Sequence, residues 1–390
     1  MTKNYVIIGA GIAGLSAAQA IREQDPHGQI DIFTAENNLP YSRPMLTKAP
    51  FISFDPSRWT IYDEAWFESQ KINLHIGEKV TKIDTENKWI IGDKTYPYNK
   101  LILATGAESF RIPVPGADLP NVYTIRRSED IINIKRAYKA DTNVVVIGGG
   151  VIGLEAAVEL ARYGAKVTVL EAMPYLMSRQ IDEEISDLIR QKLSNIDIII
   201  DAHITEIAED RVIFEDSTFL PCNFVVMACG IKAETSIIPE DVAIQKSIVI
   251  DEHCQTTCKH IYAAGDCAQF RGVNYALWSQ GLTQGEVAGR HAAGDEDAVL
   301  TDFDTSLVMN SPELSLFALG DMGKNPDLKY EIKYASSKDE PNSFFANPTQ
   351  GEFFEKQYLV NKKVVGAALV GNLTRMQNLK DKILGVEATK

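Results

Sequence analysis

The strongest constraint on the fold is a pattern that occurs twice in the chain. Each copy has a short run of β-branched residues, then Gly-x-Gly-x-x-Gly, then an alanine-rich stretch with helical spacing, and the copies start at Tyr5 and Val144. A strand that runs into a glycine turn and then a helix opens a βαβ unit, so the sequence predicts this unit in duplicate. The glycines of the two copies are Gly9, Gly11 and Gly14, and Gly148, Gly150 and Gly153.

Each copy is followed by a second predicted strand that ends at an acidic residue. These strands cover residues 29–35 and 166–170, and the acids are Glu36 and Glu171. In a dinucleotide-binding fold, an acid about 20 residues after the glycine turn accepts hydrogen bonds from ribose hydroxyls. The pyrophosphate lies on the helix N-terminus, where free N–H groups and the helix dipole favour an anion. We therefore expect two dinucleotide sites.

The three glycines of each copy have separate roles in such a site. Gly9 permits the tight turn, Gly11 lets the backbone approach the pyrophosphate, and Gly14 lets the helix pack close to the strand. The second copy repeats these roles in the same order. Two glycine turns without any ligand are the alternative, but the strand, the helix and the acid around each turn favour nucleotide binding.

Glu171 also indicates which pyridine nucleotide the second site would take. A 2′-phosphate would meet the negative charge of this carboxylate, and residues 172–174 supply no arginine to neutralise it. The sequence therefore favours NADH over NADPH. The alternative is that Glu171 is only a solvated strand end.

The charge of the chain limits its partners. The net charge is −14 over 390 residues. Nucleic acids and anionic membranes need a basic face, so neither is expected as a partner. A chain of this length is also too long for one ordinary core, so two or three domains are expected.

The cysteines and the N-terminus both bear on the location. There are five cysteines, an odd number that fits reduced thiols better than a disulfide framework. Residues 5–21 carry no charge and could be taken for a signal peptide, but a nucleotide-binding strand and helix explain them better. A cytoplasmic location is therefore expected.

No metal site is expected. Cys254 and Cys258 form a Cys-x3-Cys pair with His253 and His260 nearby. The cysteine pair alone would need two more ligands to hold a metal ion. Ordinary thiols near a strand turn are the simpler interpretation.

Turn-rich stretches divide the chain into domains. Residues 111–120 contain three prolines and a glycine and read as a domain connection, and a second crossing is expected near residues 230–239. The predicted fold class is α/β, with two Rossmann-like, three-layer ββα domains and a small α+β C-terminal domain. The C-terminal domain is expected to contain strands at residues 357–360 and 364–370. The predicted domains are residues 1–110 with 235–300, residues 111–234, and residues 301–390.

Three further segments carry a specific resemblance. They are Leu101-Ile-Leu-Ala-Thr-Gly106, Phe224-Val-Val-Met-Ala-Cys-Gly230 and Ile261-Tyr-Ala-Ala-Gly-Asp266. Together with the glycine turns, they resemble the FAD-dependent pyridine nucleotide-disulfide oxidoreductase superfamily from residue 5 to about residue 290. Cys229 stands where this superfamily usually has threonine.

This resemblance implies that the first site binds FAD and the second NADH. Asp266 would accept a hydrogen bond from the ribityl chain. A helix at residues 277–293 would point its N-terminus at the flavin, and its dipole would stabilise the negative charge of the reduced ring. Trp278 would lie against the ring, or would be a core tryptophan. The implied FAD contacts are Glu36, Arg43, Pro44, Val80, Ala104, Thr105, Gly106, Asp266 and Trp278, and the implied NADH contacts include Val151, Ile152, Glu171 and Gly230.

The absence of early cysteines points to one branch of the superfamily. The disulfide reductases carry a redox-active cysteine pair beside the flavin, whereas this chain has no cysteine before residue 222. Its Tyr41-x-Arg-Pro-x-Leu-x-Lys48 pattern resembles the NADH:rubredoxin reductases and ferredoxin reductases. In that branch Lys48 would lie near the flavin and pair with Glu155, which offsets the unfavourable burial of either charge. The alternatives are a solvated lysine and a first-turn acid that complements its own helix.

The expected function is electron transfer from NADH through FAD to a small iron–sulfur carrier, with rubredoxin favoured. The alternatives are an NADH oxidase, a ferredoxin reductase and an NADH-responsive redox-sensing protein. The electron-entry module of a larger reductase is disfavoured because no cluster-binding domain is attached. A monomer or a homodimer is expected.

An acidic carrier would need a basic docking surface on this chain. Two candidate clusters are present, although an ordinary solvated face is the simpler interpretation of each. They are Arg126, Arg127, Lys135, Arg136 and Lys139, and Lys362 with Lys363.

Overall fold

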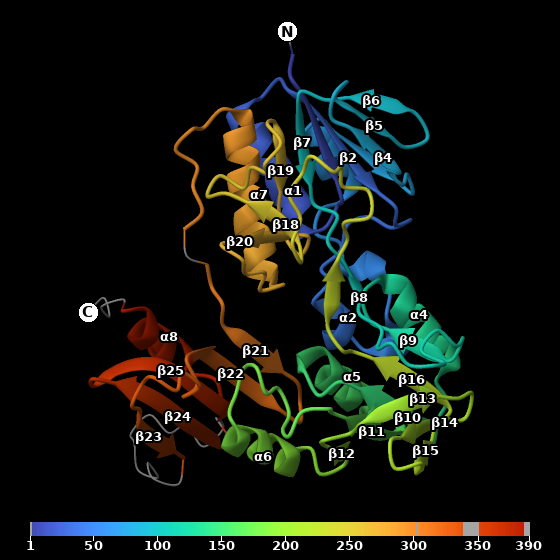
Figure 1. Ribbon diagram of the computed structural model, residues 1–390, viewed down its shortest axis with the longest axis vertical. Coiled ribbons are helices and arrows are strands. Elements are labelled where there is room, and N and C mark those ends of the chain that lie inside the picture. Colours follow the sequence, from blue (N-terminus) through green and yellow to red (C-terminus); the bar gives the residue numbers. More distant parts are fainter. Residues whose placement is uncertain (1, 302, 338–350, 386–390) are drawn as a thin grey trace.

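The computed structural model describes residues 2–301, 303–337 and 351–385. Three of its sheets have five strands each, two of them built mainly from the N-terminal and central parts of the chain and the third from its C-terminal part (Figure 1). The predicted fold class is confirmed, because the two Rossmann-like sheets and a smaller C-terminal sheet are all present.

The first sheet is parallel, with strand order β19-β7-β1-β2-β3. Its strands alternate with other elements along the chain, and β19 joins them from far downstream. Their bounds are β1 Asn4–Ile8, β2 Gln29–Thr34, β3 Ile72–Ile76, β7 Lys100–Leu103 and β19 Ile261–Ala263. The short antiparallel sheet of β4 (Lys82–Asp84), β5 (Trp89–Ile91) and β6 (Thr95–Pro97) contributes to the same core.

Two helices pack together on the first sheet, α1 (Ile12–Gln24) and α7 (Trp278–Ala293). Their close approach depends on glycines spaced one turn apart on α7. A Cβ added to Gly285 would lie 2.2 Å from the backbone oxygen of Ala13, and one added to Gly289 would lie 2.4 Å from that of Ala17. α7 also has the bounds that the sequence predicted, with Leu277 as its N-cap.

The second sheet repeats the plan of the first, with strand order β12-β11-β10-β16-β9 and all pairs parallel. The predicted duplication is therefore visible in the topology: β10, β11, β12 and β16 take the places of β1, β2, β3 and β7. The bounds are β9 Val122–Thr124, β10 Asn143–Ile147, β11 Lys166–Leu170, β12 Asp197–Ile199 and β16 Phe224–Met227. The helices are α4 Ser128–Ala137, α5 Val151–Arg162 and α6 Glu183–Lys192, and the short antiparallel sheet is β13 Ile204–Ile207, β14 Arg211–Phe214 and β15 Phe219–Pro221.

The chain passes between the two sheets twice, and the two passages lie side by side. β8 (Ala107–Ser109) pairs antiparallel with β17 (Ile231–Ala233). The domain boundaries predicted at 110/111 and 234/235 fall just after these strands and stay a prediction. A further two-stranded sheet joins β18 (Ile248–Ile250) to β20 (Ala268–Phe270).

The segment that follows β2 packs away from the first sheet. It contains α2 (Met45–Lys48), η1 (Phe51–Ser53) and η2 (Pro56–Trp59), and α3 (Glu64–Ser69) then leads to β3. The buried side chains of Leu46 and Phe51 belong to the core that surrounds α5 of the second sheet. Part of the predicted first domain is therefore held against the second sheet.

The C-terminal sheet is antiparallel, with strand order β21-β22-β25-β24-β23. It contains the two strands that the sequence predicted there. The bounds are β21 Leu307–Asn310, β22 Ser315–Gly320, β23 Glu331–Ser336, β24 Phe353–Val360 and β25 Lys363–Gly371, with α8 Met376–Leu384. Alternate residues face opposite ways: Leu369 packs with α8, whereas Val370 joins the core of the second sheet. No helix in the described ranges is long and apolar enough to cross a membrane.

Candidate cofactor-binding cavity

A single cavity of about 1610 Å³ reaches both glycine turns. Sites for one small ligand typically measure about 300–1,000 Å³, so this volume has room for more than one. All of the predicted site residues line the cavity except Gly14 and Gly153. The lining residues are Gly9, Gly11, Glu36, Arg43, Pro44, Lys48, Val80, Ala104, Thr105, Gly106, Gly148, Gly150, Val151, Ile152, Glu155, Glu171, Gly230, Asp266 and Trp278.

The two glycines outside the cavity are in tight packing positions. A Cβ on Gly14 would lie 2.0 Å from the backbone oxygen of Gly9, and one on Gly153 would lie 1.9 Å from that of Gly148. This geometry matches the close helix–strand packing expected of the third glycine. Gly9 and Gly148, the first of each set, have φ of +108° and +111°, a conformation that favours glycine.

The middle glycines leave open space at two helix N-termini. Gly11 and Gly150 are the N-caps of α1 and α5, and neither helix has a side-chain cap or an acid in its first turn. A Cβ added at either glycine would meet no atom within 4 Å. Uncapped N–H groups beside empty space suit an anion, so the structure fits a pyrophosphate at each helix.

Glu171 is held at the end of β11 by backbone groups. One carboxylate oxygen accepts from the Gly149 amide at 2.7 Å and the other from the Met173 amide at 2.8 Å. A carboxylate has about four acceptor positions, so lone pairs remain for a ribose hydroxyl. Arg179 lies on the same cavity wall, beyond the residues on which the sequence argument rested, and has no ion-pair partner among the described residues.

Glu36 is engaged differently from Glu171. Its carboxylate forms an ion pair with Arg43 and accepts a hydrogen bond from the Tyr41 hydroxyl at 2.7 Å. Arg43 also donates to the backbone oxygen of Arg126 at 2.7 Å. Glu36 therefore fixes Arg43 at the cavity wall. The sequence analysis missed the contribution of Tyr41.

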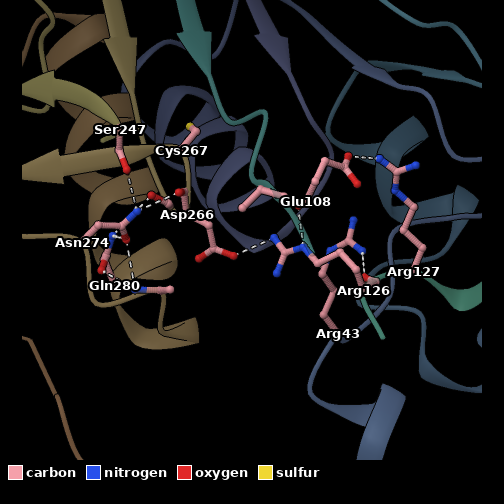
Figure 2. A network of polar contacts seen from close by, with 12 residues as sticks. Arg43, Glu108, Arg126, Arg127, Ser247, Asp266, Cys267, Asn274 and Gln280 are labelled. Carbon is pink, nitrogen blue, oxygen red and sulfur yellow. Dashed lines mark hydrogen bonds and ion pairs between the residues drawn. The ribbon is translucent and has the colours of Figure 1, made fainter. Parts of the chain in front are cut away.

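Arg126 is part of the cavity, so its assignment to an exposed docking surface is wrong. Its guanidinium donates to Asp266 and to the backbone oxygen of Ala107, each at 2.7 Å (Figure 2). The side chain is 18% exposed. Arg126 follows β9 at the carboxyl end of the second sheet, and this position could have identified it. Arg127, the next residue, also lines the cavity but pairs with Glu108 at a more exposed position.

Asp266 and the start of α7 lie on the other side of this ion pair. Figure 2 shows the Asp266 carboxylate directed toward Arg126, and its backbone oxygen accepts from Asn274 at 2.8 Å. Gln280 of α7 donates to Asn274 at 3.0 Å. These contacts tie Asp266 to the first turn of the helix, where Trp278 lines the cavity.

Lys48 and Glu155 lie together as the family resemblance implied. Lys48 Nζ is 3.9 Å from Glu155 Oε1, which has no hydrogen-bond partner in the described structure. The other oxygen of Glu155 accepts from the Thr47 hydroxyl, a contact that the sequence analysis missed. Burial raises the pKa of Glu155 above its ordinary 4.5, while Thr47 and Lys48 act in the opposite direction. The catalytic role of the pair stays a prediction.

We expect Glu155 to introduce a pH dependence that glutamine would remove. The raised pKa means that the folded protein holds this proton more tightly than the unfolded chain. The contribution of Glu155 to the free energy of unfolding is therefore fully present below the pKa that Glu155 has in the unfolded chain. It is lost as pH rises through the higher pKa that Glu155 has in the folded protein. The NADH reduction rate of wild-type protein should show a transition above pH 4.5. Glu155→Gln should lack this transition and melt no lower at pH 8.

Stopped-flow reduction at several pH values and a thermal melt at pH 8 check this expectation. Lys48 is 36% exposed, so water can solvate its charge when the carboxylate is removed. Persistence of the same pH transition in Glu155→Gln would assign it to another group.

The cysteines are not arranged for thiol chemistry beside this site. All five are free thiols, and burial raises the pKa of Cys229, which lines the cavity, to about 11. A thiol with a raised pKa is a poor nucleophile near neutral pH. Within the described ranges, no group of three His, Cys, Asp or Glu residues is placed to hold a metal ion.

Comparison with known proteins gives the family of this chain. The pyridine nucleotide-disulphide oxidoreductase model matches residues 3–292. The rubredoxin–NAD(+) reductase of Ectopseudomonas oleovorans is 33% identical over 68% of this chain and 72% of its own length. The crystal structure of NADH:rubredoxin oxidoreductase from Clostridium acetobutylicum superposes with a TM-score of 0.79 at 26% identity, over 99% of this chain and 96% of that one.

A longer relative is also similar over almost the whole chain. The nitrite reductase (NAD(P)H) of Bacillus subtilis is 33% identical over 95% of this chain, which spans 46% of that protein. The matched family model covers both glycine turns, the Ala-Thr-Gly turn and the Asp266 segment. The chain belongs to the pyridine nucleotide-disulphide oxidoreductase family, whose members bind FAD and a pyridine nucleotide.

Proposed function

We propose that the protein transfers electrons from NADH through FAD to a small iron–sulfur carrier, with rubredoxin as the first carrier to test. The observation that carries this proposal is the single cavity that joins two glycine turns of the same geometry. Two nucleotides bound at these turns would share one continuous cavity. The similarity to a rubredoxin–NAD(+) reductase supports the choice of acceptor.

The residues of the first sheet suit FAD. The N-terminus of α1 would hold its pyrophosphate, and Asp266 would accept from its ribityl chain. Arg126 donates to Asp266 and holds this carboxylate in place at the cavity wall. Arg43, fixed by Glu36, would contribute a second positive charge along the cavity wall.

The residues of the second sheet suit NADH. The N-terminus of α5 would hold the pyrophosphate, and Glu171 would accept from the ribose. When bound, FAD would take a hydride from NADH and release the electrons singly to the carrier. Lys48 would hold positive charge near the reacting rings, with Glu155 as its buried counter-ion. Hydride transfer needs no protein general base, because no proton is abstracted from NADH in this step.

Stopped-flow mixing tests this function in two steps. The FAD-loaded protein is first mixed with NADH or NADPH, and the bleaching of flavin absorbance gives the reduction rate. The reduced protein is then mixed with rubredoxin, a ferredoxin or air-saturated buffer. Fast reoxidation by rubredoxin, and slow reoxidation by air, is the expected result. Fast reoxidation by air alone would replace the proposal with an NADH oxidase.

A second candidate function is electron supply to a nitrite-reducing centre. The similarity to the B. subtilis nitrite reductase covers nearly all of this chain but only about half of that protein. In such a reductase the same electron path would end at a further part of the assembly. Reoxidation by the catalytic part of a nitrite reductase, without reoxidation by rubredoxin, would favour this candidate. The similarity to part of a longer reductase therefore reopens the electron-entry module that the sequence disfavoured.

We also propose a cytoplasmic location and the domain limits given above. The five unpaired cysteines support the location, since reduced thiols persist in the cytosol. The β8–β17 pair supports the domain limits, because both crossings between the sheets pass through it.

A further inference from the structure

The segment that follows Glu171 forms one wall of the cavity and lies between two sheets. It connects β11 to α6, and Tyr175, Ser178 and Arg179 of this segment line the cavity. Figure 1 shows α6 between the second sheet and the C-terminal sheet. Whatever holds this segment therefore shapes the wall that faces the second nucleotide.

The start of the segment is fixed by the second sheet itself. Glu171 accepts from the Gly149 amide, and the Met177 amide donates to the Gly149 oxygen at 3.1 Å. Leu176 and Met177 are buried in the core of the second sheet. Glu171 and Met177 thus both hydrogen-bond to Gly149, which belongs to the second glycine turn.

The end of the segment is fixed by the C-terminal sheet. Lys356 of β24 is 6% exposed and pairs with both Asp182 and Glu184, at the N-terminus of α6. The Tyr358 hydroxyl donates to Asp182 at 2.7 Å. A lysine buried between two carboxylates holds the N-terminus of α6 against the C-terminal sheet.

Between these ends, a lysine of the C-terminal part also contacts the segment. Lys324, in the connection after β22, donates to the backbone oxygen of Ser178, and its ammonium lies 5.9 Å from the ring centroid of Tyr175. Lys324 does not line the cavity, whereas both of its partners do. Lys324 therefore contacts residues of the cavity wall without itself facing the cavity.

We propose that Lys324 is a positioning residue for the pyridine nucleotide, through which the C-terminal sheet holds the wall segment in its binding conformation. The inference rests on the proposed NADH site at the second glycine turn. An ordered wall costs less conformational entropy when the ligand binds, so the contact raises affinity without touching the ligand. The C-terminal part thus contributes to nucleotide binding, although it has no nucleotide-binding fold.

Titration of the oxidised, FAD-loaded protein with ADP-ribose tests this role without turnover. ADP-ribose contains the pyrophosphate and both riboses but no nicotinamide. Lys324→Met should weaken its binding about tenfold, which corresponds to about 1.4 kcal/mol. Lys324→Arg should stay within about threefold of wild type, because it keeps the charge and the donor. In steady state, Lys324→Met should raise the KM for NADH with little change in kcat.

The matched control is Lys333→Met on β23 of the same sheet, where the lysine is 56% exposed. This change should leave ADP-ribose binding unaltered. Equal affinity of Lys324→Met and wild type would overturn the positioning role. A simultaneous loss of FAD, or a lower reduction rate at saturating NADH, would also overturn it, because the effect would then be general damage. Lys324→Ala, which also removes the charge and the donor, gives the same comparison if the methionine variant does not fold.

The same titration separates this inference from the function on which it rests. If wild-type protein fails to bind ADP-ribose, the proposed nucleotide site is wrong. If wild type binds and Lys324→Met binds equally well, only the role of Lys324 is wrong.

Discussion

Valine at Gly11 is expected to give a folded protein without flavin, and valine at Gly150 a folded, yellow protein that NADH cannot reduce. Both glycines have extended backbone that any residue can adopt, and a Cβ at either would meet no protein atom within 4 Å. The added side chain would occupy only the space in front of the helix N-terminus. We expect binding of the corresponding nucleotide to weaken by at least about 100-fold, or about 2.7 kcal/mol.

Flavin absorbance per protein measures the first effect, and stopped-flow reduction measures the second. Circular dichroism and a thermal melt of the flavin-free proteins show whether the fold is retained. The matched controls are Gly14→Val and Gly153→Val, where the new Cβ would collide with a backbone oxygen. These should lose stability as well as the nucleotide. A Gly11→Val protein that keeps its flavin would place the FAD pyrophosphate elsewhere.

The glycine turns could be predicted from the sequence because their constraints are local. Turn, helix start and close packing all fall within six residues, so the spacing alone indicates each role. The duplication added a second, independent copy of the same evidence. For the same reason the bounds of β11 and α7 were predicted closely.

Two of the contacts that the sequence did not indicate join distant segments. Arg126 meets Asp266 across 140 positions, and Thr47 meets Glu155 across 108. Each pairing depends on the way the two sheets and the α2 segment are placed in space. A charged residue such as Arg126 looks the same in sequence whether it faces solvent or a cavity. Its position after a parallel strand was the one available signal.

The expected preference for NADH also depends on residues that do not directly follow Glu171 in the sequence. Residues 172–174, which directly follow Glu171, contain no cation. The structure places Arg179 on the cavity wall that also contains Glu171. The cavity in which Glu171 would repel a 2′-phosphate therefore also contains a cation that could attract it. Removing the acid should leave that cation as the dominant charge.

Glu171→Gln is accordingly expected to shift the preference toward NADPH by about 10- to 100-fold, or about 1.4–2.7 kcal/mol. Glutamine keeps an acceptor for the Gly149 amide but removes the negative charge. The ratio of kcat/KM for NADPH and NADH gives the preference of each variant. Wild type should favour NADH, and the gain with NADPH should fall with added salt, since charge attraction is screened.

The cation itself is tested by the pair of variants Glu171→Gln and Glu171→Gln/Arg179→Gln. If Arg179 binds the 2′-phosphate once the acid is removed, the double variant should lose most of the NADPH gain and keep its NADH rate. Glu36→Gln is the matched control at the first sheet, where the same change should leave the nucleotide preference unaltered. Equal use of NADH and NADPH by wild type would show that Glu171 does not exclude the 2′-phosphate. In that case Arg179 already offsets its charge in the native protein.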